Sequence, residues 1–313
     1  MEITTLLSRQ ILSMGIMLVI AFALCKCGVL KTEHNKILSA ISVYVATPAI
    51  ILHAFMQEYT PERAKGLLLA VILTTGTEFL WIGVSYLLGK PLKIDKIERA
   101  NMVFFNGGLA MPIVQAALGT EAVFFCCAHS FSQNILIWTY GLISISGNKH
   151  ISVKKILTSL PMISVGVGLI IFFSRVKMPE LVTSTVDQLF NINGPLVMCI
   201  AGLILAGADL KACVGRLRNY LTVFGRLIFM PCLFIGVVAL TGITKTIPYA
   251  RDVCYPLAIA FSTPPATTIT ILASLYSTKA DAEESSTLNV MCVIFCLLTI
   301  PLISVIFQFM CPA

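Results

Sequence analysis

Ten separate stretches of about twenty apolar residues each run along this 313-residue chain, and they limit its fold more than any other feature. A helix of about twenty apolar residues is long enough to cross the hydrocarbon core of a bilayer. Hydrophobic residues make up 57% of the chain and charged residues 12%, whereas a soluble domain has about 45–50% apolar and about 25% charged residues. The composition excludes a soluble enzyme, a disordered chain and a nucleic-acid binder. The sequence predicts an all-α, polytopic membrane protein with transmembrane helices over residues 7–29, 37–56, 66–88, 97–118, 122–145, 156–174, 185–208, 220–241, 253–274 and 285–310.

The basic residues divide unequally between the two predicted membrane sides. With the N-terminus outside, the inner loops carry about two thirds of the 22 Lys and Arg residues, and this division assigns Arg226 to an inner loop. Cytoplasmic loops are enriched in Lys and Arg, so both termini are expected outside the cytoplasmic membrane. The N-terminus has no small-x-small cleavage site after its first apolar run, so we read residues 7–29 as a transmembrane helix rather than a signal peptide.

The ten predicted helices divide into two sets of five. A short basic loop at 147–155, expected in the cytoplasm, separates residues 1–146 from residues 156–313. Thr47-Pro48-Ala49 in the second helix corresponds to Gly194-Pro195-Leu196 in the seventh. An odd number of spans in each repeat forces the two copies into opposite membrane orientations. The sequence therefore predicts two inverted five-helix repeats.

The fourth and ninth helices are interrupted at corresponding places in the two halves. The fourth contains Asn106-Gly107-Gly108 and Pro112, and the ninth contains residues 262–265. The ring of Pro112 clashes with the carbonyl of Gly108, and a broken backbone at membrane depth persists only where it is buried in protein or lines a polar cavity. Paired broken helices are typical of secondary transporters, and each break leaves a helix N-terminus that suits an anionic group. The predicted substrate-binding residues are Asn106, Gly107, Gly108, Pro112, Ser262, Thr263, Pro264 and Pro265; helix kinks without a site are the alternative.

Further polar residues interrupt the predicted apolar helices. Glu78 lies near the middle of the third helix, where it could couple transport to a proton or act as a structural carboxyl group. His129, Gln133 and Asn134 lie together on the fifth helix, where they could support the site or a proton pathway, or make ordinary interior contacts. Ser285 and Asn289 belong to a polar stripe on the tenth helix and predict polar packing between helices.

These features resemble the auxin efflux carrier family, bacterial branch, within the larger superfamily that also holds bile-acid and arsenite carriers. The resemblance covers nearly the whole chain through short motifs, at residues 46–50, 106–112, 201–210, 260–266 and 272–276. It implies a ten-helix inverted-repeat fold with a scaffold domain and a transport domain. It also implies that the fourth and ninth helices unwind and cross at the substrate site, with Asn106, Pro112, Pro264 and Pro265 at the crossover. Dimers through the scaffold helices are typical of such relatives.

The expected function is secondary transport of a small organic anion, such as malonate, another mono- or dicarboxylate, or an auxin-like acid, by alternating access. A proton or sodium ion could be coupled to it, and uncoupled transport is equally open. A sodium-coupled symporter like the bile-acid carriers is one alternative, with oxygen ligands from Ser262, Thr263, Gln133 and Asn134. A membrane-embedded sensor or an enzyme is another, in which His129 would need a facing Ser or Cys nucleophile. No nucleotide-binding motif or metal-ligand spacing is present, so no cofactor, no resident metal and no enzymatic activity are expected.

Overall fold

The computed structural model describes residues 2–147, 158–208 and 215–312, and these residues form helices joined by short loops. The predicted basic loop at 147–155, apart from Gly147, and Asp209 at the end of the 201–210 motif lie outside the described residues. The helices, some continued by short 3-10 or π turns (η), are α1 (Glu2–Lys26), η1 (Thr32–His34), α2 (Asn35–Ile41), η2 (Ser42–Ala46), α3 (Thr47–Phe55), α4 (Pro61–Gly89), α5 (Lys96–Val103), α6 (Gly107–Leu118), α7 (Thr120–Leu136), η3 (Ile137–Gly141), α8 (Leu142–Ser146), α10 (Leu160–Ser174), α11 (Glu180–Gly207), α13 (Leu217–Phe224), η4 (Gly225–Phe229), α14 (Met230–Thr241), α15 (Ile243–Thr246), α16 (Ala250–Phe261), α17 (Thr267–Tyr276) and α18 (Lys279–Met310). The all-α prediction is confirmed for the part of the chain that the structure describes.

Within the described residues, six helical segments are long and apolar enough to cross a membrane: Arg9–Lys26, Thr32–Phe55, Pro61–Gly89, Glu180–Gly207, Leu217–Thr241 and Lys279–Met310. Their outward faces remain apolar: Leu240 and Phe309 are 90% and 86% exposed. An apolar surface of this kind fits contact with lipid chains. A polytopic membrane protein is therefore confirmed, while the division into ten spans and two inverted repeats stays a prediction.

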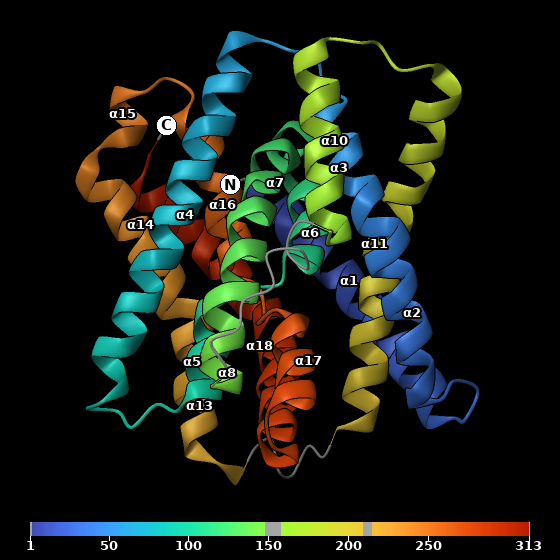
Figure 1. Ribbon diagram of the computed structural model, residues 1–313, viewed down its shortest axis with the longest axis vertical. Helices are drawn as coiled ribbons and strands as arrows, with labels where there is room; N and C mark the ends of the chain where they lie inside the picture. The colour runs from blue at the N-terminus through green and yellow to red at the C-terminus, as the bar shows by residue number, and fades with distance from the viewer. Residues whose placement is uncertain (1, 148–157, 209–214, 313) are drawn as a thin grey trace.

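The helices pack as two groups that Figure 1 shows beside each other. The first group, which we call the α1/α11 group, contains α1, α2, α3, α10 and α11, with α1 lying along α11 and α3 against α10. α1 and α11 approach each other closely at Gly202. A methyl group added there would lie only 2.5 Å from the carbonyl oxygen of Leu18. The second group, which we call the crossover group, contains α4 to α8 and α13 to α18.

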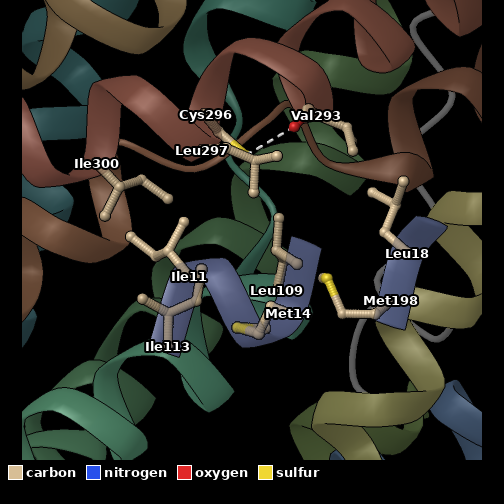
Figure 2. Close-up of a pocket in the computed structure, with 10 residues that line it drawn as sticks. All are labelled: Ile11, Met14, Leu18, Leu109, Ile113, Met198, Val293, Cys296, Leu297 and Ile300. Atoms are coloured by element: carbon tan, nitrogen blue, oxygen red, sulfur yellow. Dashed lines mark hydrogen bonds between the residues drawn. The ribbon is translucent and has the colours of Figure 1, made fainter. Parts of the chain in front are cut away.

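Apolar side chains fill one part of the interface between the two groups, where α1 and α11 meet α6 and α18. A crevice of about 10 Å³ lies there, about the space of one water molecule. Figure 2 shows the side chains that line it. It is lined by Ile11, Met14 and Leu18 of α1, Met198 of α11, Leu109 and Ile113 of α6, and Val293, Cys296, Leu297 and Ile300 of α18. These lining side chains hold no charged group, so their contacts are set by shape rather than by polar pairing.

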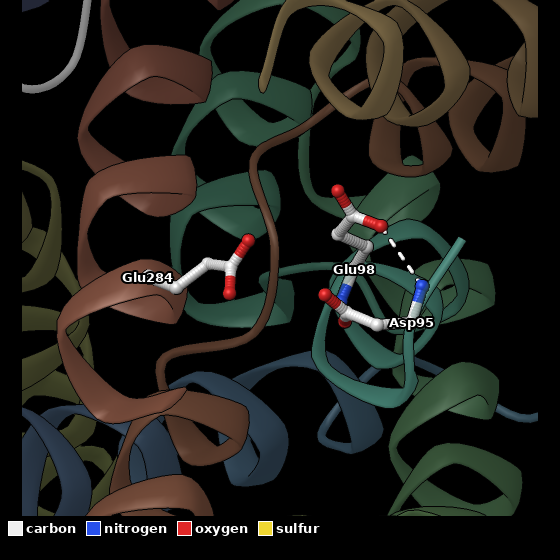
Figure 3. A group of neighbouring side chains, drawn as sticks. All are labelled: Asp95, Glu98 and Glu284. Atoms are coloured by element: carbon white, nitrogen blue, oxygen red, sulfur yellow. Dashed lines mark hydrogen bonds between the residues drawn. The ribbon is translucent and has the colours of Figure 1, made fainter. Parts of the chain in front are cut away.

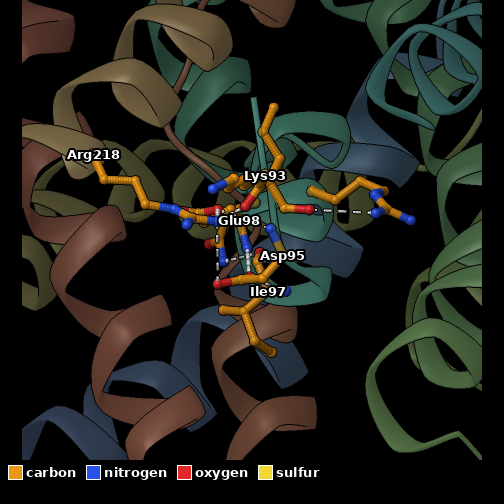
Figure 4. Close-up of polar contacts among 8 residues, drawn as sticks. Lys93, Asp95, Ile97, Glu98 and Arg218 are labelled. Carbon is orange, nitrogen blue, oxygen red and sulfur yellow. Dashed lines mark hydrogen bonds and ion pairs between the residues drawn. The ribbon is translucent and has the colours of Figure 1, made fainter. Parts of the chain in front are cut away.

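Charged side chains join three helices at one end of the crossover group. Asp95 caps α5 by accepting hydrogen bonds from the N–H groups of Ile97 and Glu98, at 2.8 and 2.9 Å. Asp95, Glu98 and Glu284 of α18 lie close enough to resemble a metal site (Figure 3). Arg218 of α13 points at this cluster and binds both oxygens of Glu98, at 2.5 and 2.6 Å (Figure 4). The guanidinium therefore supplies the positive charge that these acids need, and ties α13 to α5.

The close approach of α1 and α11 gives a stability prediction. Gly202→Ala places a methyl group against the backbone of Leu18, so we expect the protein to lose about 1–3 kcal/mol of unfolding free energy. Gly166→Ala, in an exposed turn of α10 with open space around it, is the matched control and should be neutral or slightly stabilising. The midpoint of thermal unfolding in detergent measures both. Equal midpoints for the two variants would contradict the close packing.

Candidate functional site

Two breaks in the helices lie against each other at the centre of the crossover group. Residues 104–106 separate α5 from α6, and residues 262–266 separate α16 from α17. Phe105 and Pro265 face each other as an antiparallel pair. Segments more than 150 residues apart in the chain thus meet at one point, which we call the crossover.

The two broken segments satisfy each other's backbone groups. The N–H of Asn106 donates to the carbonyl of Pro264 at 2.8 Å, and the N–H of Ala266 donates to the carbonyl of Phe104 at 3.0 Å. A backbone N–H or C=O group that has no hydrogen-bond partner at membrane depth destabilises the fold by roughly several kcal/mol, because no water is there to replace the partner. The two breaks therefore stabilise each other, and neither would be stable alone.

A side chain from a neighbouring helix supports each break. Gln133 of α7 donates to the carbonyl of Phe105 at 2.7 Å, and Asn289 of α18 donates to the carbonyl of Pro265 at 3.0 Å. The two amides thus bind the two residues that face each other across the crossover. Gln133 was predicted as polar support, whereas Asn289 was predicted only to pack between helices.

Pro112 does not break its helix, contrary to the prediction. Gly107 and Gly108 are the first residues of α6, and Pro112 lies inside that helix. The missing N–H of Pro112 leaves the Gly108 carbonyl without its usual helical donor. The side-chain amide of Asn193, on α11, donates to that carbonyl at 3.1 Å instead. A side chain from the other helix group, which no sequence motif predicted, therefore compensates for the proline.

A cavity of about 390 Å³ lies beside the crossover, between the two helix groups. The N-termini of α6 and α17 open on it through Gly107, Gly108, Thr267 and Thr268. The first N–H groups of a helix have no partner within the helix and carry partial positive charge. The other polar lining residues are Asn35, Ser39, Ser42, Thr47, Asn106, His129, Ser130, Gln133, Asn134, Thr270, Ser286 and Asn289. No Asp, Glu, Lys or Arg is among the described lining residues.

The predicted site residues therefore divide into two sets. Those that line the cavity are Asn106, Gly107, Gly108, His129, Gln133 and Asn134; those that do not are Glu78, Pro112, Ser262, Thr263, Pro264 and Pro265. Both Ser262 and Thr263 are fully buried, and their hydroxyls donate at 2.7 Å to carbonyls of their own helix. The four side chains named for a sodium site thus do not share one cavity.

Arg226 was missed as a site residue, although it lies fully buried at the crossover. Its Nε donates to the carbonyl of Thr263 at 3.1 Å and its Nη2 to that of Phe261 at 2.6 Å. Its Nη1 donates to the carbonyls of Met102 and Val103, at 3.0 and 3.3 Å. One guanidinium therefore binds the C-terminal ends of both α5 and α16. The assignment of Arg226 to an inner loop was wrong; a single arginine within an apolar stretch was the available signal.

Two aromatic rings and one acid surround Arg226. The rings of Trp81 and Phe105 lie 5.1 and 5.7 Å from its Cζ atom. Glu78, one turn before Trp81 on α4, is fully buried, and its two oxygens have no hydrogen-bond partner among the described residues. The side chains of Ser132 on α7 and of Arg226 lie near enough to interact electrostatically with its carboxyl group. Glu78 is therefore close to the crossover but separate from the cavity.

His129 packs directly under the first residue of α6. Its Nδ1 shares a hydrogen bond with the carbonyl of Cys126, and its ring centre lies 4.7 Å from that of Phe105. A methyl group on Gly107 would overlap the His129 Nε2 atom. Within the described chain, the His129 ring makes no hydrogen bond to a Ser hydroxyl or a Cys thiol.

The contact between Gly107 and His129 gives a second prediction. We expect Gly107→Ala to reduce transport at least tenfold, because its methyl group pushes the start of α6 away from α7. The double variant Gly107→Ala/His129→Ala removes the overlapping ring and should regain part of that activity. Uptake of a labelled substrate into cells or vesicles, normalised to the amount of folded protein, measures transport by the single and the double variant. An unrestored double variant would show that the overlap with His129 is not the cause.

Comparisons with known proteins identify the family of the chain. A family model described as membrane transport protein matches residues 6–156 and 150–304, which together cover most of the chain. A protein from Methanocaldococcus jannaschii named as an uncharacterized transporter is 27% identical over 198 residues, which are 59% of this chain and 64% of the relative. The chain thus spans somewhat less than two thirds of the length of that relative. It therefore belongs to the membrane transport protein family, the auxin efflux carrier family of membrane transporters.

Proposed function

We propose that this chain is a secondary carrier of small organic anions, with its substrate site in the cavity beside the crossover. One observation carries the proposal: two helix N-termini open on a cavity whose described lining contains no acidic residue. Helix N-termini favour negative charge, and an acid in the lining would repel it. A mono- or dicarboxylate such as malonate, or an auxin-like acid, has the charge and the size for a cavity of about 390 Å³.

The buried charges near the cavity support the same choice of substrate. Arg226 lies behind the ring of Phe105, and Phe105 itself lines the cavity. Opposite charges attract more strongly in a low-dielectric interior than in water. The fixed positive charge of Arg226 and the two helix ends therefore act together on an anion, whereas a cation would meet unfavourable fields from both.

The packing of the two groups supports alternating access. In the proposed inverted repeat, α1 and α10 are equivalent, and so are the second and seventh predicted spans. The observed pairs, α1 with α11 and α3 with α10, are then two copies of one contact. The apolar crevice of Figure 2 lets the crossover group move past the α1/α11 group with few polar contacts to break.

The placement in the cell is part of the proposal. The cavity lining includes Asn35, the first residue of α2, and Ser286, in the early turns of α18. The starts of α2, α5 and α18 lie toward the lower end of Figure 1. Lys31, Lys36 and Lys96 are at or near the starts of α2 and α5, as expected for the cytoplasmic side. The structure would then be open to the cytoplasm, with both termini outside. Dimer formation through the α1/α11 group is proposed by analogy with relatives alone.

Uptake of labelled carboxylates into proteoliposomes tests the site. The side chain of Asn106 caps α6 by accepting a hydrogen bond from the N–H of Leu109 at 3.2 Å. Asn106→Asp keeps this cap but adds a negative charge, so we expect at least a tenfold loss of malonate or indole-acetate uptake, equal to about 1.4 kcal/mol. Asn106→Ser keeps the cap without the charge and should retain more activity. Asn191→Ala, on an exposed position of α11, is the control. Equal uptake by the Asp and Ser variants would reject an anion site at Asn106.

Glu78 is the proposed coupling carboxyl group. A buried carboxyl group without a hydrogen-bond partner is neutral with its proton and negatively charged without it. The positive charge of Arg226 interacts with the charged form. We expect an inward proton gradient to accelerate uptake by the wild type but not by Glu78→Gln, which keeps the shape of the side chain. Glu33→Gln, in an exposed turn, should respond like the wild type. Equal acceleration in Glu78→Gln would place the coupling elsewhere, and none in the wild type would indicate uncoupled transport.

A further inference from the structure

The C-terminal ends of two broken helices converge on the side chain of Arg226. The carbonyls of Met102 and Val103 belong to the last turn of α5, and those of Phe261 and Thr263 lie at the end of α16. All four oxygens lie within 2.6–3.3 Å of guanidinium nitrogens. The last carbonyls of a helix have no partner within it and carry partial negative charge. Two such ends that face each other repel unless a positive charge lies between them.

In a membrane carrier, a small cation is one way to supply that charge. Unwound carbonyls and half-helix C-terminal ends are typical ligands of a coupling sodium ion. Here the same kind of ligand set is occupied by a covalently attached cation. A guanidinium presents five N–H donors in a planar arrangement, so it can bind several carbonyls at once.

The surroundings of Arg226 fix its position. Its side chain is fully buried, and the Trp81 ring lies 5.1 Å from its Cζ atom. The indole N–H of Trp81 donates to the carbonyl of Met230 at 3.0 Å, so that α4 and α14 together hold the ring in place. The carboxyl group of Glu78, on the same helix as Trp81, adds an electrostatic interaction. Arg226 therefore has no freedom to leave the crossover while the helices stay packed.

We propose that Arg226 is the fixed cation of the crossover and takes the place of a metal cation there. Neither stability nor transport then needs sodium or lithium ions. When Arg226 is truncated, the four carbonyls that it bound form an empty site of hard oxygen ligands that accepts a small monovalent cation. The inference rests on the proposed transport function only where it concerns uptake, because the unfolding measurement needs no substrate.

Thermal unfolding of the full-length protein in detergent tests the proposal. The midpoint is measured in NaCl, LiCl and choline chloride at equal ionic strength, for the wild type, Arg226→Ala and Arg226→Lys. We expect one midpoint for the wild type in all three salts. Arg226→Ala should unfold about 5 °C or more below the wild type in choline, and sodium or lithium should raise its midpoint in a saturable way. Arg226→Lys keeps the positive charge with fewer hydrogen-bond donors. Its unfolding midpoint in choline should lie between those of the wild type and Arg226→Ala, and sodium should not change it.

Arg175→Ala is the matched control, because Arg175 also stacks on an aromatic ring, 4.3 Å from that of Tyr59, but outside the crossover. It should show no specific response to sodium. A saturable rise of the wild-type midpoint with sodium would overturn the proposal. So would an Arg226→Ala variant that is as stable as the wild type, or one that no small cation restores.

The test still decides if Arg226→Ala does not fold or if no carboxylate is transported. If Arg226→Ala does not fold, the wild type and Arg226→Lys decide, since a sodium response in either contradicts a resident arginine cation. Uptake is measured with and without sodium in the same preparations, and wild-type uptake should not change. Failure to transport any carboxylate, combined with sodium-independent stability, would reject the proposed substrate class and leave the role of Arg226 supported.

Discussion

A backbone that leaves its helix inside a bilayer must find new partners for its N–H and C=O groups, and this requirement organises the whole crossover. The two breaks pair with each other through the N–H groups of Asn106 and Ala266. Gln133 and Asn289 bind the carbonyls of the facing residues. Arg226 binds the carbonyls at the ends of α5 and α16. The N-termini of α6 and α17 are then free to face the cavity, so the polar chemistry of the site depends on how the breaks are satisfied behind it.

This arrangement gives the two sides of the crossover opposite electrical character. The helix C-termini lie on the side of Arg226, where one guanidinium balances their partial negative charge. The helix N-termini lie on the side of the cavity, where the described lining contains neither an acid nor a strong base. An anion bound at the proposed site would meet oriented backbone dipoles, with Arg226 behind the ring of Phe105 and no charged side chain in the described lining to pair with it directly.

Composition and residue pattern were enough to predict the helical membrane class and to locate both breaks within a few residues. The sequence could not show which residue of each motif leaves the helix. Pro112 looked like the helix breaker, yet Asn106 caps α6 before it and Asn193 satisfies the carbonyl that the proline exposes. That partner is 85 residues away in the chain, and local rules cannot detect it. Arg226 escaped notice for a related reason: an arginine near the end of an apolar stretch reads as a membrane-flanking charge.

The proline in α6 also affects how the two helix groups hold on to each other. Because Pro112 has no N–H, the carbonyl of Gly108 belongs to no helical hydrogen bond and is free to take a partner from α11. Exchanging that partner costs a single hydrogen bond and leaves every turn of α6 intact. The contact between Gly108 and Asn193 is therefore one that the two helix groups could break without unwinding any turn of α6.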